Sequence, residues 1–425
     1  MSAPQVDRRA IAAWCVYDWA ISAFNTVIGT FVFSVYVAKG VATDEVAGTA
    51  AWGQAMSLAG LALLLLSPVL GAVADRAGPR KPWLAAMTGI CVAATLSLWW
   101  VRPDPADLMF ALVMAGLATV AFELAGVFYN AMLAEVAPPS MLGRVSGWGW
   151  GVGYFGGLAC LVAALFVFIG DNSPIALWLG TENQEPVRAT AVLAALWCAV
   201  FAIPLFIWVP EPAFERRPLG QAVREGVAML IETLRRARAQ KNLFRFLIAS
   251  ACYRDGINTI TAFGGLYAAG TFGMSFEEII VFAIFLNILA GVGAISFAWI
   301  DDRRGARFAI LVSLVGLSVC GVALLLVEAK LWFWVFALGL GAFFGPAQAA
   351  GRTLMAKLSP PGQEAEMFGL YGFAGRAVGF FGPAAFGLAT AAYASQRAGL
   401  ATVLVFFAVG IALMLTVKEP KTRLG

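Results

Sequence analysis

The chain has 425 residues, of which 61% are hydrophobic and only 13% charged, and its mean hydropathy is +0.82. Soluble domains are roughly 45–50% apolar and about 25% charged, so this composition excludes a soluble protein and predicts one embedded in a membrane. The formal net charge of +4 is small. We interpret it as a signal of membrane orientation and predict no nucleic-acid partner.

Twelve apolar stretches are long enough to cross a bilayer, since a helix needs about 20 residues to span a hydrocarbon core of roughly 30 Å. The sequence therefore predicts an all-α membrane protein with twelve transmembrane helices. The expected spans are residues 11–38, 47–74, 82–101, 107–135, 143–170, 187–209, 244–270, 276–300, 307–327, 331–356, 366–393 and 398–417.

The first span carries Asp18 and is too long for a cleaved signal peptide, so we expect it to remain in the protein. Orientation follows from the loops, because cytoplasmic loops are rich in Lys and Arg. We predict an integral protein of a bacterial inner (plasma) membrane with both termini cytoplasmic. The far side then keeps only Lys39, Arg102, Arg188, Lys330 and Arg397, while most of the other basic residues, Arg352 and Lys357 among them, are assigned to the cytoplasmic side.

The second and eighth spans end in the same charged pattern, D-R-x-G-x-R, at Asp75–Arg80 and Asp302–Arg307, about 227 residues apart. Two other pairs of segments repeat at similar offsets: Ala134–Pro139 with Ala356–Pro361, and Gly153–Gly157 with Gly379–Pro383. Membrane proteins built from two similar halves are often transporters with a site between the halves. We predict two pseudo-symmetric six-helix bundles, residues 1–210 and 244–425, joined by a cytoplasmic linker at 211–243.

The linker is the long polar stretch of the chain. Apolar residues recur in it at helical spacing, at Leu219, Val223, Val227, Leu230 and Leu234. This pattern predicts an amphipathic helix that lies against the cytoplasmic face and the bilayer surface. A regulatory or partner-binding helix is the alternative.

Among the charged residues inside expected spans, five stand out: Asp18, Glu123, Arg254, Asp255 and Arg376. A charge in the bilayer costs at least about 2.5–3.5 kcal/mol, so such residues are candidates for function. Asp18 and Asp255 occupy matching positions in the pattern C-x-x-D-x-x-x-[ST]. We therefore expect each half to present one carboxylate, with structural pairing to Arg254 or Arg376 as the alternative.

A cavity lined by acids and arginine suits a zwitterion, whose ammonium and carboxylate need opposite partners, and it suits an organic anion nearly as well. Arg254 is expected either to bind a substrate carboxylate or to neutralise the neighbouring acids. The chain has no histidine, so proton coupling would have to use carboxylates. Further hydrogen bonds are expected from Tyr17, Asn25, Tyr129, Asn130, Asn258 and Asn287.

The charged clusters at the helix ends are expected to act in gating. Asp75, Arg76, Arg80 and Glu135 can pair with one another or cap helix termini, which would close the cytoplasmic side of an outward-facing state. A signal for topology alone is the alternative. In the second half the expected gating residues are Asp302, Arg303 and Arg307, with Arg376 at the interface of the halves.

Two six-helix halves with this repeated motif resemble the major facilitator superfamily. The segments Trp14–Phe24, Phe128–Ala131 and Arg254–Thr259 resemble the signatures of its vacuole-effluxer (autophagy-related) family, and Ile21 and Arg254 depart from them. The resemblance implies the major facilitator fold, in which the first and seventh helices face each other across a central cavity. It also implies export of small amino acids.

We therefore predict a secondary active transporter of a small polar solute, an amino acid or a related zwitterion or organic anion, that is proton-coupled and works in the efflux direction. The alternative is a flippase or exporter of lipid-like amphiphiles with the same fold. The chain lacks the G-x-x-x-x-G-K-[ST] sequence of ATP-driven pumps. No enzymatic activity, cofactor or metal is expected. The expected partners are a small-molecule substrate, the lipid bilayer and protons, and the chain is expected to be a monomer.

Overall fold

The computed structural model describes residues 7–169, 173–180, 182–211, 218–236 and 240–420. These residues form helices and the turns between them, and no strand occurs among them. Ten helical segments of this part are long and apolar enough to cross a membrane. The predicted all-α membrane protein is thereby confirmed.

The first half begins with a long span from Arg8 to Val41 in which α-helical and π-helical turns alternate. Its elements are α1 (Arg8–Ala23), η1 (Phe24–Phe31), α2 (Phe33–Tyr36), η2 (Val37–Val41), α3 (Glu45–Ala77), α4 (Lys81–Ser97), η3 (Leu98–Trp100), η4 (Pro105–Asp107), α5 (Leu108–Ala131), α6 (Leu133–Val136), η5 (Pro139–Met141), α7 (Leu142–Ala163), η6 (Ala164–Ile169), α8 (Pro174–Leu179) and α9 (Glu185–Trp208).

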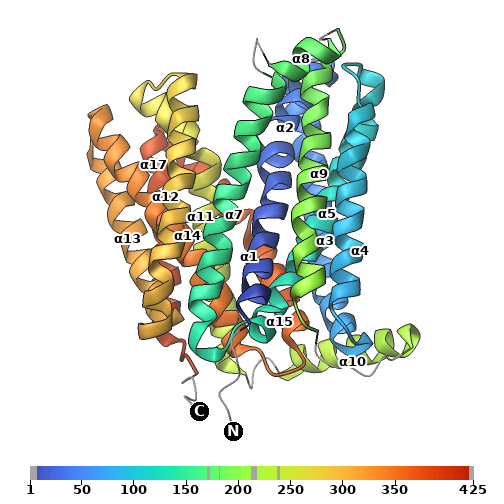
Figure 1. Ribbon diagram of the computed structural model, residues 1–425. Coiled ribbons are helices and arrows are strands. Elements are labelled where there is room, and N and C mark those ends of the chain that lie inside the picture. Colours follow the sequence, from blue (N-terminus) through green and yellow to red (C-terminus); the bar gives the residue numbers. More distant parts are fainter. Residues whose placement is uncertain (1–6, 170–172, 181, 212–217, 237–239, 421–425) are drawn as a thin grey trace.

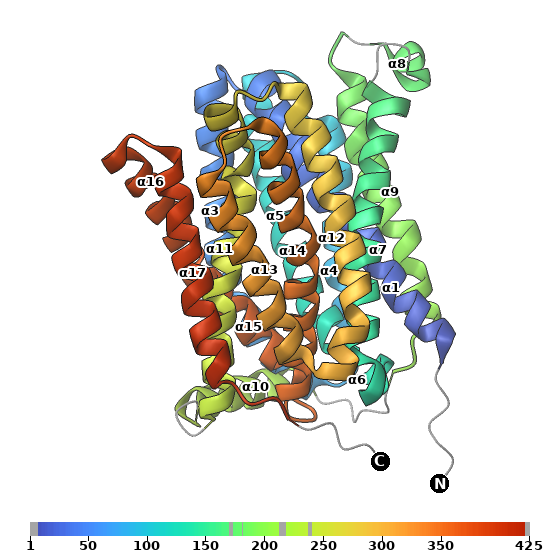
Figure 2. The same ribbon diagram turned by 90° about the vertical axis from the view of Figure 1, so that its left-hand side faces the viewer.

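The second half follows the linker helix α10 (Leu219–Arg236). Its elements are α11 (Lys241–Phe272), α12 (Phe276–Arg304), α13 (Ala306–Leu326), α14 (Lys330–Leu358), α15 (Glu364–Val378), α16 (Phe381–Tyr393) and α17 (Gln396–Thr416). The two halves stand side by side, and α10 lies across one end of the bundle (Figures 1 and 2). The start of α1 and the end of α17 lie at this same end, which we call the α10 side.

The repeated motif ends one helix and begins the next in each half. Gly78 follows α3 with φ +119°, and Gly305 follows α12 with φ +95°. A side chain at such a positive φ would be strained, so both positions need glycine. The tight connection brings the charged residues of the motif to the helix ends on the α10 side.

The expected span at 366–393 is not one continuous helix. α15 ends at Val378 and α16 begins at Phe381, so the chain breaks its helical hydrogen bonding at Gly379 and Phe380. The new helix start leaves free N–H groups, which need acceptors in a membrane. Asp255 of α11 supplies one, since its Oδ2 accepts a hydrogen bond from Gly382 N at 2.8 Å.

The linker helix α10 packs against α3 of the first half. A Cβ at Gly226 would lie 2.8 Å from Ala72 O, so the two helices touch through their backbones. Met229 and Leu230 are buried in this contact, whereas Val223 is 44% exposed. The linker residues 212–217 and 237–239, and the side chains of Leu219 and Leu234, lie outside the described part of the chain.

The two halves meet closely along α3 with α15 and along α7 with α12. A Cβ at Gly71 of α3 would lie 2.3 Å from Ala365 O, and one at Gly369 of α15 would lie 2.4 Å from Ser67 O. On the other seam, a Cβ at Gly147 would lie 2.6 Å from Ala294 O. Glycine therefore permits backbone contact between the halves, as small residues commonly do in membrane proteins.

We expect Gly71→Ala to favour separation of the halves on the α10 side, because the new methyl group collides with the backbone of the opposite half. Overpacking of this kind costs about 1–3 kcal/mol. Ser67→Cys, at a site only 2% exposed, reports the change as faster labelling by a maleimide. Gly53→Ala on the same helix is the control, because its Cβ has nothing within 4 Å. Equal labelling rates in the two variants would contradict the expectation.

Candidate functional site

Arg352 on α14 joins the second half to three helices of the first. Its Nη1 donates to Asp18 Oδ2 on α1 at 3.0 Å and to Asn130 Oδ1 on α5 at 3.2 Å. Its Nε and Nη2 donate to the hydroxyl and the carbonyl oxygen of Ser146 on α7, at 3.0 and 2.6 Å. The Arg352 side chain is only 4% exposed and that of Asp18 17%. This ion pair is therefore a buried link between the halves.

Aromatic side chains of the first half surround the guanidinium of Arg352. Its Cζ lies 4.7 Å from the ring centre of Trp14, 5.7 Å from that of Tyr129 and 5.6 Å from that of Trp150. Cations are attracted to aromatic faces at such distances. The Tyr129 hydroxyl also donates to Asp18 Oδ2 at 2.9 Å. Asp18, Tyr129 and Asn130 thus belong to one cluster, which Arg352 completes from the opposite half.

Arg352 is not among the site residues predicted from the sequence, where it is assigned to the basic residues of the cytoplasmic side. Its position in the repeat was a usable signal. Asn130 and Arg352 are 222 residues apart, the same offset that relates Ala134 to Ala356. The two residues are therefore equivalent positions of the two halves, and they contact each other across the interface.

Glu123 and Arg376 form a second ion pair between the halves. Arg376 Nη2 on α15 lies 2.7 Å from Glu123 Oε1 on α5. Unlike the Asp18–Arg352 pair, these side chains remain accessible, with 42% of Glu123 and 28% of Arg376 exposed. The pair is therefore open to exchange with a ligand or with water.

Arg254 and Asp255 are neighbours on α11 but have separate contacts. The Arg254 guanidinium lies over the ring of Tyr371 on α15, 4.4 Å from its centre, and Nη1 donates to Tyr371 O at 3.4 Å. Asp255 is 1% exposed and accepts from Gly382 N, while its Oδ1 has no hydrogen-bond partner within the described residues. The two matched acids therefore have different partners: Asp18 accepts from the Arg352 guanidinium of α14, and Asp255 accepts from the backbone N of Gly382 in α16.

The remaining polar candidates are scattered. Tyr17 lies fully buried in the first half, where its hydroxyl is 2.7 Å from Thr88 Oγ1. It therefore contributes to packing within the first half, whereas the sequence predicted a hydrogen bond to substrate in a cavity. Asn287 Nδ2 donates to Ala283 O of its own helix at 2.8 Å. Asn25 and Asn258 are exposed.

On the α10 side, Arg80 lies among three acids. Its Nη2 contacts Asp75 Oδ1 at 2.9 Å and Glu364 Oε2 of the second half at 2.5 Å, and its Nη1 contacts Glu135. The Arg80 side chain is only 2% exposed. Burial disfavours its charge, but the carboxylates outweigh burial and raise the pKa of the guanidinium.

The aspartates of the two motifs each contact a helix start in the opposite half. Asp75 accepts from the backbone N of Ala365 and Glu366 at the start of α15, at 3.2 and 2.8 Å. Asp302 accepts from Gly143 N at the start of α7 at 2.8 Å. It also pairs with Arg144 Nε at 2.5 Å. A carboxylate at a helix N-terminus is stabilised by the free N–H groups and the helix dipole.

Three other gating candidates differ in their contacts. Arg76 Nη2 lies 2.8 Å from Met229 Sδ of α10, so it joins α3 to the linker helix. Arg307 donates to Met414 O and Leu415 O within its own half. Arg303 is exposed. The described contacts between the halves therefore involve Asp75, Arg80 and Asp302 of the two motifs.

Comparisons with known proteins agree with this architecture. The solved structure of FucP in the outward conformation superposes with a TM-score of 0.77 at 12% identity, covering 97% of this chain and 100% of that one. The proton:xylose symporter XylE superposes with a TM-score of 0.76 at 14% identity, covering 97% of this chain and 96% of that one. At this level of identity the likeness shows the fold alone. The fold is the one that these two major facilitator superfamily proteins share.

The sequence comparisons then give the family. A profile described as "Vacuole effluxer Atg22 like" matches residues 6–424. The uncharacterized MFS-type transporter YxiO of Bacillus subtilis (strain 168) is 25% identical over 411 residues, covering 96% of this chain and 94% of YxiO. The chain belongs to the vacuole effluxer Atg22-like family.

Fungal members of the family are longer. Autophagy-related protein 22 of Cryptococcus neoformans var. neoformans serotype D (strain JEC21 / ATCC MYA-565) is 26% identical over 294 residues. That match covers 64% of this chain and 49% of the fungal protein, so it spans about half the length of that relative.

Proposed function

We propose that this protein moves a small polar solute, an amino acid or a related zwitterion or organic anion, by alternating access between its two halves. In this proposal transport is proton-coupled and runs in the efflux direction. The family description as an effluxer supports the direction. The membrane proposed is a bacterial inner membrane, as the Bacillus relative suggests.

The proposed topology has the α10 side in the cytoplasm. The two D-R-x-G-x-R motifs lie on this side, and basic residues concentrate in cytoplasmic loops. The state described here is then closed towards the cytoplasm, because the motif aspartates and the Arg352–Asp18 pair bind the halves together there. Transport requires a second state in which these contacts are broken.

The proposed substrate class is supported by one observation, the accessible ion pair between Glu123 and Arg376. An amino acid has an ammonium group for Glu123 and a carboxylate for Arg376, so it can replace each partner of the pair with its own charge. The direct link between the halves then becomes a link through the substrate. In this proposal Arg376, expected from the sequence to act in gating, takes the substrate role that was expected for Arg254.

A ligand screen tests this proposal. Amino acids and organic anions are added to the purified protein and its melting temperature is recorded. A ligand that binds the folded state stabilises it by about 2.7 kcal/mol at a hundred times its Kd. We expect stabilisation by a zwitterion or an organic anion. Stabilisation by neutral sugars alone would contradict the proposed class.

We assign proton coupling to Asp255, an acid on α11 that is 1% exposed and whose Oδ1 has no hydrogen-bond partner within the described residues. Asp255→Asn keeps an oxygen that can accept from Gly382 N but cannot release a proton. We expect this variant to lose pH-gradient-driven accumulation in proteoliposomes and to keep substrate exchange at equal pH. Accumulation at the wild-type level would remove Asp255 from the coupling mechanism.

A further inference from the structure

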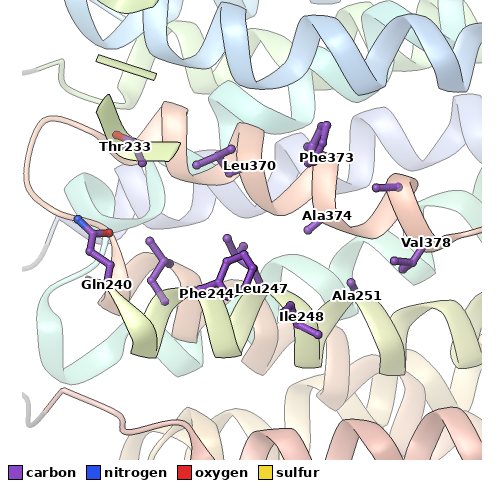
Figure 3. A pocket seen from close by; sticks show the side chains of 12 residues that line it. Thr233, Gln240, Phe244, Leu247, Ile248, Ala251, Leu370, Phe373, Ala374 and Val378 are labelled. Carbon is purple, nitrogen blue, oxygen red and sulfur yellow. The ribbon is translucent and has the colours of Figure 1, made fainter. Parts of the chain in front are cut away.

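A groove opens between α11 and α15, away from the contacts that join the halves at Arg352 and Asp18. It encloses about 240 Å³ and extends along both helices (Figure 3). Its walls are apolar, with Phe244, Ile248, Leu370 and Phe373 among them. Polar side chains occur at one end, where Thr233 of α10 and Gln240 before α11 line it.

The groove matches one leaflet of a bilayer in length. It runs along α11 from Gln240 to Ala251, which corresponds to about 16 Å at 1.5 Å per residue. Half of a hydrocarbon core of roughly 30 Å has nearly the same depth. Its rim is open outward, since Phe244 is 50% exposed, Ile248 39% and Phe373 37%. In a membrane the apolar molecules available to such a rim are lipid acyl chains.

Exposed basic residues occur close in sequence to the polar end of the groove at Thr233 and Gln240. Residues 235–245 contain five basic residues and no acidic one. Of these, Arg235, Lys241 and Arg245 are exposed. Clusters of basic residues next to the end of a membrane helix attract anionic lipid headgroups. Lys241 and Arg245 both lie on α11, the helix that also lines the apolar groove.

We propose that this groove binds an anionic phospholipid of the leaflet on the α10 side. One acyl chain lies between α11 and α15, and the headgroup contacts Lys241, Arg245 and the polar end at Gln240. The groove does not include Glu123 or Arg376, the proposed substrate pair. Lipid binding in the groove therefore does not depend on which solute is transported.

The experiment compares two lipids on delipidated protein in a neutral detergent. Phosphatidylglycerol is expected to raise the melting temperature more than phosphatidylcholine, and to bind more tightly by native mass spectrometry. Lys241→Gln with Arg245→Gln should remove this preference, at about fivefold in affinity for each basic residue. The control is Arg102→Gln, which removes an exposed charge far from the groove and should keep the preference.

Ala374→Trp fills the groove from α15 and should weaken binding of both lipids. Ala384→Trp, at an exposed position of α16 outside the groove, is its matched control. If Ala374→Trp fails to fold, the charge variants still decide the question. Equal binding of the two lipids by the wild type, or a preference that survives the loss of Lys241 and Arg245, would overturn the proposal.

Discussion

Replacing Arg352 by glutamine is expected to lower the free energy of unfolding by about 3–5 kcal/mol, because it leaves the Asp18 carboxylate without its charged partner in a largely buried place. The variant also loses the contacts to Asn130 and Ser146. Denaturant unfolding in detergent measures the change. The double variant Asp18→Asn with Arg352→Gln should regain much of the loss, since no unpaired charge remains.

Arg144→Gln is the matched control for this prediction. Arg144 also pairs across the interface, with Asp302, but Arg144 is 31% exposed, and Asp302, itself 8% exposed, keeps the hydrogen bond from Gly143 N when Arg144 is replaced. Exposed pairs contribute about 0–1 kcal/mol, so its removal should have a small effect on unfolding. Equal losses of stability in Arg352→Gln and Arg144→Gln would show that burial of the Arg352 cluster is not what binds the halves.

Replacing Glu123 by glutamine is expected to weaken substrate binding by one to three orders of magnitude, the loss typical of a charge-assisted contact. Arg376→Gln should have the same effect. Stability should change little, within about 1 kcal/mol, because both side chains are partly exposed. Binding to the purified protein and uptake into proteoliposomes are measured beside the melting temperature.

Glu278→Gln provides the control. It removes an acid that pairs with Lys330 at 2.5 Å, and both residues belong to the second half. The exposed fractions, 38% and 39%, are similar to those of the Glu123–Arg376 pair. Normal binding and transport are expected. If Glu123→Gln also transports normally, the substrate does not use this pair.

The architecture was predictable from the sequence because it depends on length, hydropathy and repetition. The apolar stretches required spanning helices, and the repeated motif required two related halves. The break between α15 and α16 was not predictable in this way. Pro383 has no N–H to donate to Gly379 O, and Asp255 of a distant helix supplies an acceptor to Gly382 N; the hydropathy of residues 366–393 gives no sign of that contact.

The candidate site was predictable in its residue types but not in its pairing. The cost of a buried charge singled out Asp18, Glu123 and Arg376. Their partners depend on which helices meet across the interface. Arg352 was missed because it lies near the end of α14, where hydropathy does not separate a helix end from a loop. Tyr17 was misplaced because its helix presents it to Thr88 inside the first half.

In alternating access, the two halves move apart on one side of the membrane as they close on the other. Spin labels test it directly in a variant without the six native cysteines. One pair, at Ser140 and Lys418, reports on the α10 side, and another, at Val46 and Leu388, reports on the opposite side. All four positions are exposed and each pair has one residue in each half.

Asp75→Asn with Asp302→Asn weakens both helix-start contacts between the halves. Electron–electron distance measurements on this double variant should show a longer Ser140–Lys418 distance together with a shorter Val46–Leu388 distance, relative to the protein with both aspartates. Unchanged distances in both pairs, or an increase in both together, would contradict alternating access controlled by the two motif aspartates.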